Sequence, residues 1–377
     1  MRTKIRSFRQ KAFFGSQIKL ADLFLKKSVH AIHRGFPILN LSAKKEIKER
    51  EMRHIQRFVL ASCLFFLVSY PLVALSQLTS GLQGPSGSTI GPDGALYVTE
   101  GLTGEVTRVD RNTGEQSMFA ENLPPLVPDF GYGGAVDVAF LDDTAYVLVS
   151  LTDPFAVGPL GGFEPQGIYR IDGPDSSTLI ADLGAWSAAN PPSNTFFFPG
   201  GVPFAMEPFR GGFLVSDGHH DRVLWVELDG TVTEFYVGID IVPTGFETWG
   251  HHVLVAQAGV VPHLPEDGKV VSVDAKNGAS MEISAGARLA VDVEFGRGRT
   301  LYILSQGEWN NAFPGSSALP MTGALFRMES DGSVTEVVDS LNLPTSLEIV
   351  GKTAYIVSLT GDIWAIELEN APPYGVR

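Results

Sequence analysis

Five histidines are the side chains of this sequence best suited to binding a metal ion. They come as two adjacent pairs and a single residue, His219-His220, His251-His252 and His263. A zinc site needs three or four ligands that converge on one point, so these residues matter only if the fold brings them together. The sequence has no other metal-binding motif, and we predict no metal site from it.

The motifs of several enzyme classes are missing. The sequence has no H-E-x-x-H, G-x-S-x-G or C-x-x-C motif. Gly351-Lys352-Thr353 lacks the upstream glycine of a phosphate-binding loop, and the glycine-rich run at 131–134 opens a predicted strand instead of a helix. No motif therefore requires a cofactor.

Seven polar side chains recur at matching points of a repeated β-pattern. Five of them close an apolar run, and two stand near the start of a neighbouring run. The first group is Glu100, Ser150, Asp217, Gln257 and Gln306, and the second is Asp137 and Asp292. Polar groups at equivalent points of several repeats can converge on one small ligand, although the same groups can also serve only loop amides and bound water. We predict that these seven residues converge at the mouth of a central tunnel and bind a ligand there, with the three aspartates supplying negative charge.

The repeat consists of short strands and tight turns. Residues 91–100, GPDGALYVTE, place an Asp-Gly turn before a strand, which is a strong hairpin signal. Similar strands follow at 145–149, 212–215, 252–255, 300–304 and 353–357. Four-strand units that recur roughly every 40–50 residues are typical of β-propeller blades. We predict an all-β, six-bladed β-propeller over residues 77–369, with repeated β-sandwiches as the alternative.

The sixth unit supplies only three strands. It ends near Leu368, which leaves the outer edge of that blade without a partner. Because an unpaired edge invites aggregation, we expect the short run at 77–80 to supply the missing strand and close the ring. Residues 370–377 are then a C-terminal tail.

Blade geometry assigns the loops to two faces. Loops between second and third strands, and loops between blades, lie on one face, whereas the turns between first and second strands lie on the other. His251 and His252 therefore lie on the face opposite His219, His220 and His263, so one metal ion cannot bind all five. The long loops at 123–133, 151–166, 187–200, 257–267 and 306–322 share the first face. We expect a ligand to bind under them, near their aromatic residues Phe130, Tyr132, Phe155, Phe163, Phe196, Phe197, Phe198, Trp309 and Phe313.

The first 57 residues differ from the rest of the chain in charge. They contain 15 Lys/Arg and 4 Asp/Glu, a net charge of +11, whereas residues 58–377 contain 13 basic and 38 acidic residues, a net charge of −25. An acidic domain of this kind argues against nucleic acid and anionic membrane surfaces as partners. We predict a monomer whose small-molecule or protein ligand binds on the loop-rich face.

An apolar run from residue 58 separates these two parts. Read from Met52, the chain has a basic region at 52–57, the apolar region, and then Ala74-Leu75-Ser76 before Gln77, which is the pattern of a signal peptide over 58–76. We predict cleavage and export to the periplasm or the medium, with Met52 as the true start or residues 1–51 as a long leader. The alternative is an uncleaved membrane anchor at 58–75, near the lower length limit of roughly 17 residues. Cys63, the only cysteine, lies in the apolar run, so the mature domain has no disulfide.

Several segments resemble known propeller families. Residues 217–223 resemble the D-x-x-x-x-R-V pattern of NHL-type propellers, which implies structural roles for Asp217 and Arg222. Residues 79–368 resemble the ScyD/ScyE family, exported proteins associated with scytonemin biosynthesis and found widely in bacteria. The matching segments are GPDGALYVTE (91–100), GEVTRVD (104–110), IADLGAWSAANP (180–191), VPTGF (242–246) and GALFRMESDGSV (323–334), and residues 247–252 depart from the family pattern. The resemblance implies a secreted propeller of the NHL and strictosidine-synthase kind, without an established reaction.

Three functions remain open at this point. The first is an exported, non-catalytic ligand-binding or scaffold propeller. The second is a hydrolase of the lactonase or strictosidine-synthase kind with a polar or metal-binding central tunnel, which is an analogy of fold only. The third is a protein-interaction platform within an exported assembly. The sequence does not decide whether the protein is an enzyme.

Overall fold

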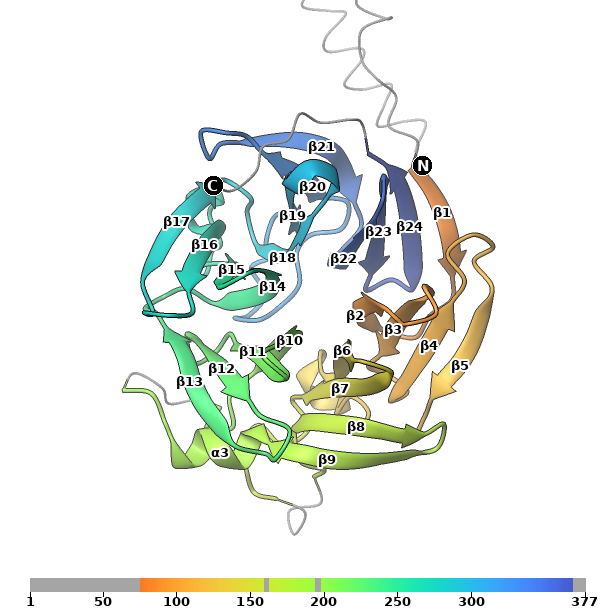
Figure 1. The fold of residues 1–377 in the computed structure, drawn as a ribbon, viewed down its shortest axis with the longest axis vertical. Helices are drawn as coiled ribbons and strands as arrows, with labels where there is room; N and C mark the ends of the chain where they lie inside the picture. The colour runs from red at the N-terminus through yellow and green to blue at the C-terminus, as the bar shows by residue number, and fades with distance from the viewer. Residues whose placement is uncertain (1–74, 159–162, 194–197, 369–377) are drawn as a thin grey trace, which may run out of the picture. The chain divides into compact units, whose positions relative to one another are not determined.

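The computed structural model describes residues 75–158, 163–193 and 198–368. These residues form six four-stranded antiparallel sheets arranged around a central axis (Figure 1), which confirms the predicted six-bladed β-propeller. The predicted leader at 1–57, residues 58–74 of the predicted signal segment 58–76 and the tail at 370–377 lie outside the described residues, as do Phe196 and Phe197 of the aromatic set. The last two residues of the predicted signal segment, Leu75 and Ser76, begin the first strand.

The first three blades follow the predicted strand order. Blade one contains β2 (Pro85–Ile90), β3 (Leu96–Glu100), β4 (Glu105–Val109) and β5 (Gln116–Ala120). Blade two contains β6 (Gly134–Leu141), β7 (Thr144–Ser150), β8 (Gly167–Gly173) and β9 (Ser176–Asp182). Blade three contains β10 (Pro203–Phe209), β11 (Gly212–Asp217), β12 (Arg222–Val226) and β13 (Val232–Val237).

The last three blades complete the ring. Blade four contains β14 (Pro243–Trp249), β15 (His252–Gln257), β16 (Lys269–Asp274) and β17 (Ser280–Ala285). Blade five contains β18 (Ala290–Phe295), β19 (Leu301–Ser305), β20 (Gly323–Met328) and β21 (Val334–Leu341). Blade six contains β22 (Pro344–Val350), β23 (Thr353–Ser358), β24 (Asp362–Glu367) and, from the start of the domain, β1 (Leu75–Ser80).

The hydrophobic core lies between neighbouring blades. Val136 and Leu148 of blade two, for example, pack in one cluster with Phe213 and Leu224 of blade three. Alternate residues of each strand point to opposite faces of its sheet, so each blade contributes apolar side chains to the blade on either side. The ring of blades is therefore held together by side-chain burial, and each inner strand keeps a fixed place at the axis.

One helix interrupts the β-architecture. Helix α3 (Leu183–Ala189) follows β9, and the Asp182 side chain caps it by accepting a hydrogen bond from Ala185 N at 2.8 Å. The sequence analysis treats part of this segment as loop, because seven residues are too few for a helical period to stand out. Short 3-10 turns occur at Pro128–Phe130, Pro265–Asp267 and Arg297–Arg299. Within the described ranges, no helix has the length and apolarity needed to cross a membrane.

The predicted ring closure is present. Strand β1 pairs antiparallel with β24, with Gln77 opposite Trp364 and Ser80 opposite Asp362. The Gln77 side chain adds a hydrogen bond from Nε2 to Asp362 Oδ1 at 2.8 Å. The first and last segments of the propeller thus complete one sheet, and the outer edge of β24 is paired.

Removing residues 77–82 is expected to lower the free energy of unfolding by several kcal/mol. The deletion takes most of β1 from the edge of β24 and also removes Leu82, which is 4% exposed. It both uncovers strand hydrogen-bonding groups and leaves a gap in the core. Urea unfolding measures the effect, with Gln77→Ala as a control that removes one exposed side-chain hydrogen bond and changes stability little. Equal stability of the deletion and the control would show that the closure is dispensable.

Candidate functional site

The innermost strand of each blade faces the propeller axis. These strands are β2, β6, β10, β14, β18 and β22 (Figure 1), and a small cavity of about 60 Å³ lies between them. The carboxyl groups that line it come from four of the six blades: Asp137, Glu207, Asp292, Glu294 and Glu348. No lysine, arginine or histidine is among the described residues around this cavity. The cavity therefore gathers acidic groups without a basic partner.

The two aspartates occupy matching positions three blades apart. Asp137 in β6 and Asp292 in β18 both stand in the tetrapeptide Ala-Val-Asp-Val. Asp137 Oδ2 accepts a hydrogen bond from Met206 N of the next blade at 2.6 Å, and Asp292 Oδ2 accepts one from Leu347 N of its next blade at 2.8 Å. Each aspartate also accepts a bond from the following amide of its own strand. Both carboxyl groups thus join two neighbouring inner strands.

Each aspartate also depends on a glycine of the preceding blade. A Cβ atom at Gly87 would lie 2.1 Å from Asp137 Oδ1, and one at Gly245 would lie 2.3 Å from Asp292 Oδ1. Real Cβ atoms do not approach an oxygen so closely, so a larger residue would displace the carboxyl group. This arrangement, with a glycine, an aspartate and a backbone amide on three successive inner strands, occurs twice around the ring. It gives the tunnel an approximate two-fold symmetry.

Four glutamates occupy equivalent points on four successive inner strands. They are Glu207 in β10, Glu247 in β14, Glu294 in β18 and Glu348 in β22. Each follows an apolar residue and lies near the end of its strand, so the four carboxyl groups form a partial ring around the axis. We call these four residues the glutamate ring.

The members of the glutamate ring differ in their hydrogen bonds. Glu247 accepts bonds from Thr248 N at 2.7 Å and from Phe295 N of the next blade at 3.0 Å. The Glu348 carboxyl group has no hydrogen-bond donor among the described residues. The two oxygens of Glu348 are therefore available to a ligand.

Burial and mutual repulsion keep the tunnel carboxyl groups protonated to unusually high pH. Burial is the largest cause for every one of them. It raises the pKa of Asp292 to about 7, and it raises the pKa of Asp137, Glu207 and Glu348 well above the ordinary carboxyl range. Neighbouring carboxylates raise the pKa further, because each new negative charge repels those already present. A bound cation would offset both the cost of burying the negative charges and the repulsion between them.

An aromatic pair borders the tunnel toward the loop-rich face. The rings of Tyr132 and Phe204 stack with centroids 5.9 Å apart, and Tyr132 Oη lies 3.1 Å from Ser86 Oγ of blade one. Phe204 lines the cavity and packs in a cluster with Val291 and Leu347, which belong to blades five and six. Phe204 of blade three therefore contacts blades five and six across the tunnel, on the side of the cavity that is nearer the loop-rich face.

The order of residues along the inner strands sets the direction of access. Each inner strand runs from the loop-rich face toward the face with short turns. Phe204 lies near the start of β10, and Glu207 lies three residues further along the strand. The glutamate ring therefore lies on the side of the aromatic pair that is closer to the short-turn face. We expect a ligand of the tunnel to enter from there, and not from the loop-rich face that the sequence analysis favours.

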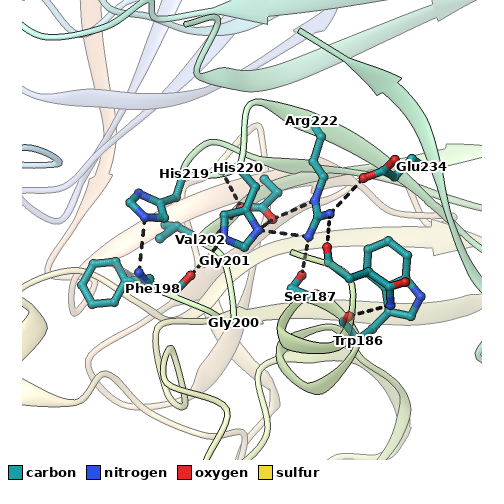
Figure 2. A network of polar contacts seen from close by, with 12 residues as sticks. Trp186, Ser187, Phe198, Gly200, Gly201, Val202, His219, His220, Arg222 and Glu234 are labelled. Carbon is teal, nitrogen blue, oxygen red and sulfur yellow. Dashed lines mark hydrogen bonds and ion pairs between the residues drawn. The ribbon is translucent and has the colours of Figure 1, made fainter. Parts of the chain in front are cut away.

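A second polar cluster lies away from the axis, in blade three. Figure 2 shows Arg222 at its centre, fully buried, with hydrogen bonds from Nη1 to Asn190 O at 2.8 Å and from Nη2 to Ser187 Oγ at 3.0 Å. Its guanidinium also lies 3.0 Å from Glu234 Oε1 and 4.9 Å from the centre of the Trp186 ring. Arg222 thus connects blade three to helix α3 and to the residue that follows the helix.

The aspartate of the same motif completes this cluster. Asp217 Oδ2 lies 2.9 Å from His220 Nδ1 and 3.4 Å from Arg222 Nε, and Oδ1 accepts a hydrogen bond from Val202 N at 2.9 Å. Burial alone would raise the pKa of Asp217, but the hydrogen bond from His220 and the nearby positive charges outweigh it and lower the pKa. Contacts of this kind fit the structural role that the D-x-x-x-x-R-V resemblance implies.

The two adjacent histidines hold the backbone of one loop residue. Phe198 N donates a hydrogen bond to His219 Nε2 at 3.3 Å, and Phe198 O lies 3.0 Å from His220 Nε2 (Figure 2). His251 lies in the turn between β14 and β15, and His252 is the first residue of β15, so both are on the opposite face. His263 lies in the loop before β16. The described residues contain no group of three or more His, Cys, Asp or Glu side chains that could hold a metal ion directly.

The structure separates the seven predicted ligand-binding residues into two groups. Asp137 and Asp292 line the axial cavity, and the other five do not. These five are buried at the loop-rich ends of the second strands, one strand away from the axis: Glu100, Ser150, Asp217, Gln257 and Gln306. Ligand binding by this second group remains a prediction.

The buried strand-end residues have different numbers of local partners. Glu100 Oε2 accepts a hydrogen bond from Gln83 N at 2.5 Å, and Gln306 Oε1 accepts one from Ala318 N at 2.9 Å. Ser150 Oγ and Gln257 Nε2, by contrast, have no protein partner within the described part of the chain. Most of the bonds that these side chains make serve the loops above them.

The glutamate ring was missed by the sequence analysis, although the sequence contains a signal for it. Four of the six inner strands carry an apolar residue followed by glutamate at the same point: Met206-Glu207, Phe246-Glu247, Val293-Glu294 and Leu347-Glu348. A repeated charge inside a strand that must be buried indicates a common environment at the axis. The repeated Ala-Val-Asp-Val tetrapeptide is a similar signal for the aspartates.

Comparison with known proteins supports the fold and no finer assignment. No protein-family model and no curated protein matches the chain. A gluconolactonase from Xanthomonas campestris is similar in structure, with a TM-score of 0.54, 13% identity, and coverage of 79% of this chain and 90% of that one. A structural genomics protein of unknown function from Bacteroides thetaiotaomicron has a TM-score of 0.52 and 10% identity, with coverage of 78% and 76%. At these identities the likeness shows the propeller fold alone.

Proposed function

We propose that this protein is an exported, non-catalytic binding protein that holds one small cation in the axial tunnel. The observation that carries the proposal is the cavity lined by the carboxyl groups of Asp137, Asp292 and three members of the glutamate ring, with no basic side chain of the described residues in its wall. Ionised carboxylates that line one small cavity repel one another strongly in a medium of low dielectric constant. A bound cation offsets that repulsion, so the arrangement favours a positively charged ligand.

The size of the cavity favours an ion over an organic molecule. A cavity of about 60 Å³ holds only a few water molecules. Pockets that enclose organic ligands usually measure roughly 300–1,000 Å³. The tunnel therefore favours a small cation with bound water over a lactone or a sugar.

The chemistry of the lining groups indicates which cations to test first. Carboxylate oxygens are hard ligands, preferred by Ca²⁺, Mg²⁺ and Mn²⁺ over soft metals. Since the described residues hold no ready set of three metal ligands, water is expected to supply part of the coordination shell. Glu348, which has no hydrogen-bond donor within the described part, is the first candidate for direct contact.

Cation binding is expected to release protons and to strengthen as the pH rises. Burial raises the pKa of Asp292 to about 7, and the neighbouring carboxyl groups also keep their protons beyond the ordinary range. A cation competes with those protons, so its affinity is expected to increase between about pH 6 and pH 8. Titration calorimetry with CaCl2, MgCl2 and MnCl2 in two buffers of different ionisation enthalpy measures both the affinity and the number of protons released.

The outcomes of this titration separate the proposed functions. Absence of binding for all three cations at pH 8, or an affinity independent of pH, would overturn the proposal. The enzyme alternative has its own assay, hydrolysis of a panel of lactones by the same protein. Hydrolysis that Glu348→Gln abolishes would assign the tunnel to catalysis instead of cation storage or sensing.

Export belongs to the proposal on the strength of the sequence. The basic region at 52–57, the apolar run and the small residues before Gln77 support cleavage by a signal peptidase, and the resemblance to the ScyD/ScyE family agrees with it. Mass spectrometry of the mature protein is expected to find Gln77 as the first residue. A mature protein that retains residues 58–75 would favour the membrane-anchored alternative.

A further inference from the structure

Two neighbouring loops of the loop-rich face expose a group of apolar side chains. Val260, Val261 and Leu264 belong to the loop between β15 and β16, and Phe313, Leu319 and Met321 belong to the loop between β19 and β20. Each of the six is between 39% and 57% exposed. We call these six residues the apolar patch. Exposed apolar side chains that gather on adjoining loops can mark an interaction site.

Contacts at their base hold the two loops together. The ring of His263 lies edge-on to Trp309, with centroids 5.9 Å apart, and Ala258 packs with Ala318 in a small apolar cluster. Trp309 pairs with Ala318 in a β-bridge, and its Nε1 donates a hydrogen bond to Ser316 Oγ at 2.8 Å. The patch is therefore presented on loops with defined internal structure, which lowers the entropy lost when a partner binds.

The length of these loops is not required by the blades that carry them. The same connection between second and third strands takes only residues 101–104 in blade one and 359–361 in blade six. The connection in blade five runs from 306 to 322, and three of its apolar side chains face solvent. An insertion that adds exposed apolar surface lowers solubility unless that surface has an occupant.

The charges on the two loops indicate the kind of occupant. Neither the segment 258–268 nor the segment 306–322 contains lysine or arginine, and together they contain Glu266, Asp267 and Glu308. A second copy of this chain would bring the same acidic groups face to face in a symmetric pair. An anionic membrane would repel them and would find no basic side chain to attract it. The favoured occupant is thus apolar at its centre and basic at its border.

We propose that the apolar patch docks a partner protein whose contact surface combines apolar side chains with lysine or arginine around them. The apolar side chains would be buried at the centre of the contact, and the acidic residues of the two loops would pair with the basic border. This surface is separate from the axial tunnel, so the inference does not depend on the cation-binding proposal.

Photocrosslinking in the producing cells tests the docking surface. The photoreactive amino acid p-benzoylphenylalanine replaces Phe313 in the full-length chain, and Leu228 receives it in a control protein. Leu228 is 43% exposed but lies in the turn between β12 and β13, on the other face. We expect one protein adduct at position 313 that is absent at position 228. Adducts with lipid only, adducts with the same chain only, equal yields at both positions, or no adduct would overturn the proposal.

Binding of the crosslinked partner in purified form tests its chemistry. The double change Leu264→Asp and Met321→Asp is expected to weaken the Kd by about tenfold or more, because it places charges at the centre of the contact. The double change Glu266→Lys and Glu308→Lys leaves the apolar side chains in place and is also expected to weaken binding, by repelling a basic border. Unchanged affinity in both variants, with thermal stability equal to that of the unaltered protein, would overturn the proposal.

Discussion

Replacing Arg222 with methionine is expected to lower the free energy of unfolding by about 3–5 kcal/mol. Arg222 is fully buried, and its guanidinium is bonded to Asn190 O, Ser187 Oγ and Glu234 Oε1. Methionine retains much of the apolar volume but none of these bonds. It also leaves the Asp217 carboxylate buried with one cation fewer, which is the costly part of breaking a buried ion pair.

The structural role of Arg222 has a local consequence as well. Because its guanidinium contacts Ser187, Asn190 and the Trp186 ring, the variant is expected to loosen helix α3 before the blades unfold. Urea unfolding gives the stability, and limited proteolysis within 183–193 reports the local effect. Arg170→Met is the matched control, because the Arg170–Asp172 pair is solvent-exposed and contributes little to stability. Similar losses of stability in both variants would contradict the assigned role.

Replacing Glu348 with glutamine is expected to stabilise the protein without cation and to weaken cation binding by about tenfold or more. The Glu348 carboxyl group is enclosed near Asp292 and Glu207 and has no hydrogen-bond donor in the described part of the chain. Glutamine cannot ionise, so the variant avoids the cost of placing a negative charge among the tunnel carboxyl groups at high pH. The same change removes a negative charge that a bound cation would use. Opposite effects on stability and binding are typical of a functional site.

The pH dependence of stability follows from the raised pKa values. A carboxyl group whose pKa is higher in the folded protein binds more protons in the folded state than in the unfolded state at intermediate pH. The contribution of such a group to the free energy of unfolding is fully present below its pKa in the unfolded chain, which is about 4. It is lost as the pH rises through the pKa in the folded protein. For Asp292 this window runs to about pH 7. Unfolding in urea without divalent cations is expected to show this decline, and Glu348→Gln is expected to reduce its slope.

An acidic residue outside the tunnel provides the control for Glu348. Glu282 lies on the outer strand β17 and pairs with Lys269 at 2.9 Å, with about half of its side chain exposed. Glu282→Gln is expected to leave cation affinity unchanged and to alter stability by less than about 1 kcal/mol. If Glu348→Gln behaves in the same way as this control, the tunnel carboxyl groups are not the binding site.

The sequence alone determined the number and kind of repeats. Alternating apolar strands, Asp-Gly turns such as Asp93-Gly94 and a repeat of near-constant length are local features, and local features can be read from a chain directly. The missing strand of blade six also followed from counting, because an edge without a partner must be filled. The same reasoning assigned the histidine pairs to opposite faces and so excluded one shared metal site.

Only the tertiary structure decided which polar residues meet. The strand-end residues such as Glu100 and Gln306 recur as regularly as the glutamate ring, and periodicity does not tell a side chain under a loop from one at the axis. That distinction depends on which strand of the blade is innermost and on the distances between blades, which no single repeat contains. Helix α3 is a similar case, since its seven residues depend on Arg222 of the next blade. Repeats determine the scaffold because they are local, whereas the site arises from contacts between repeats.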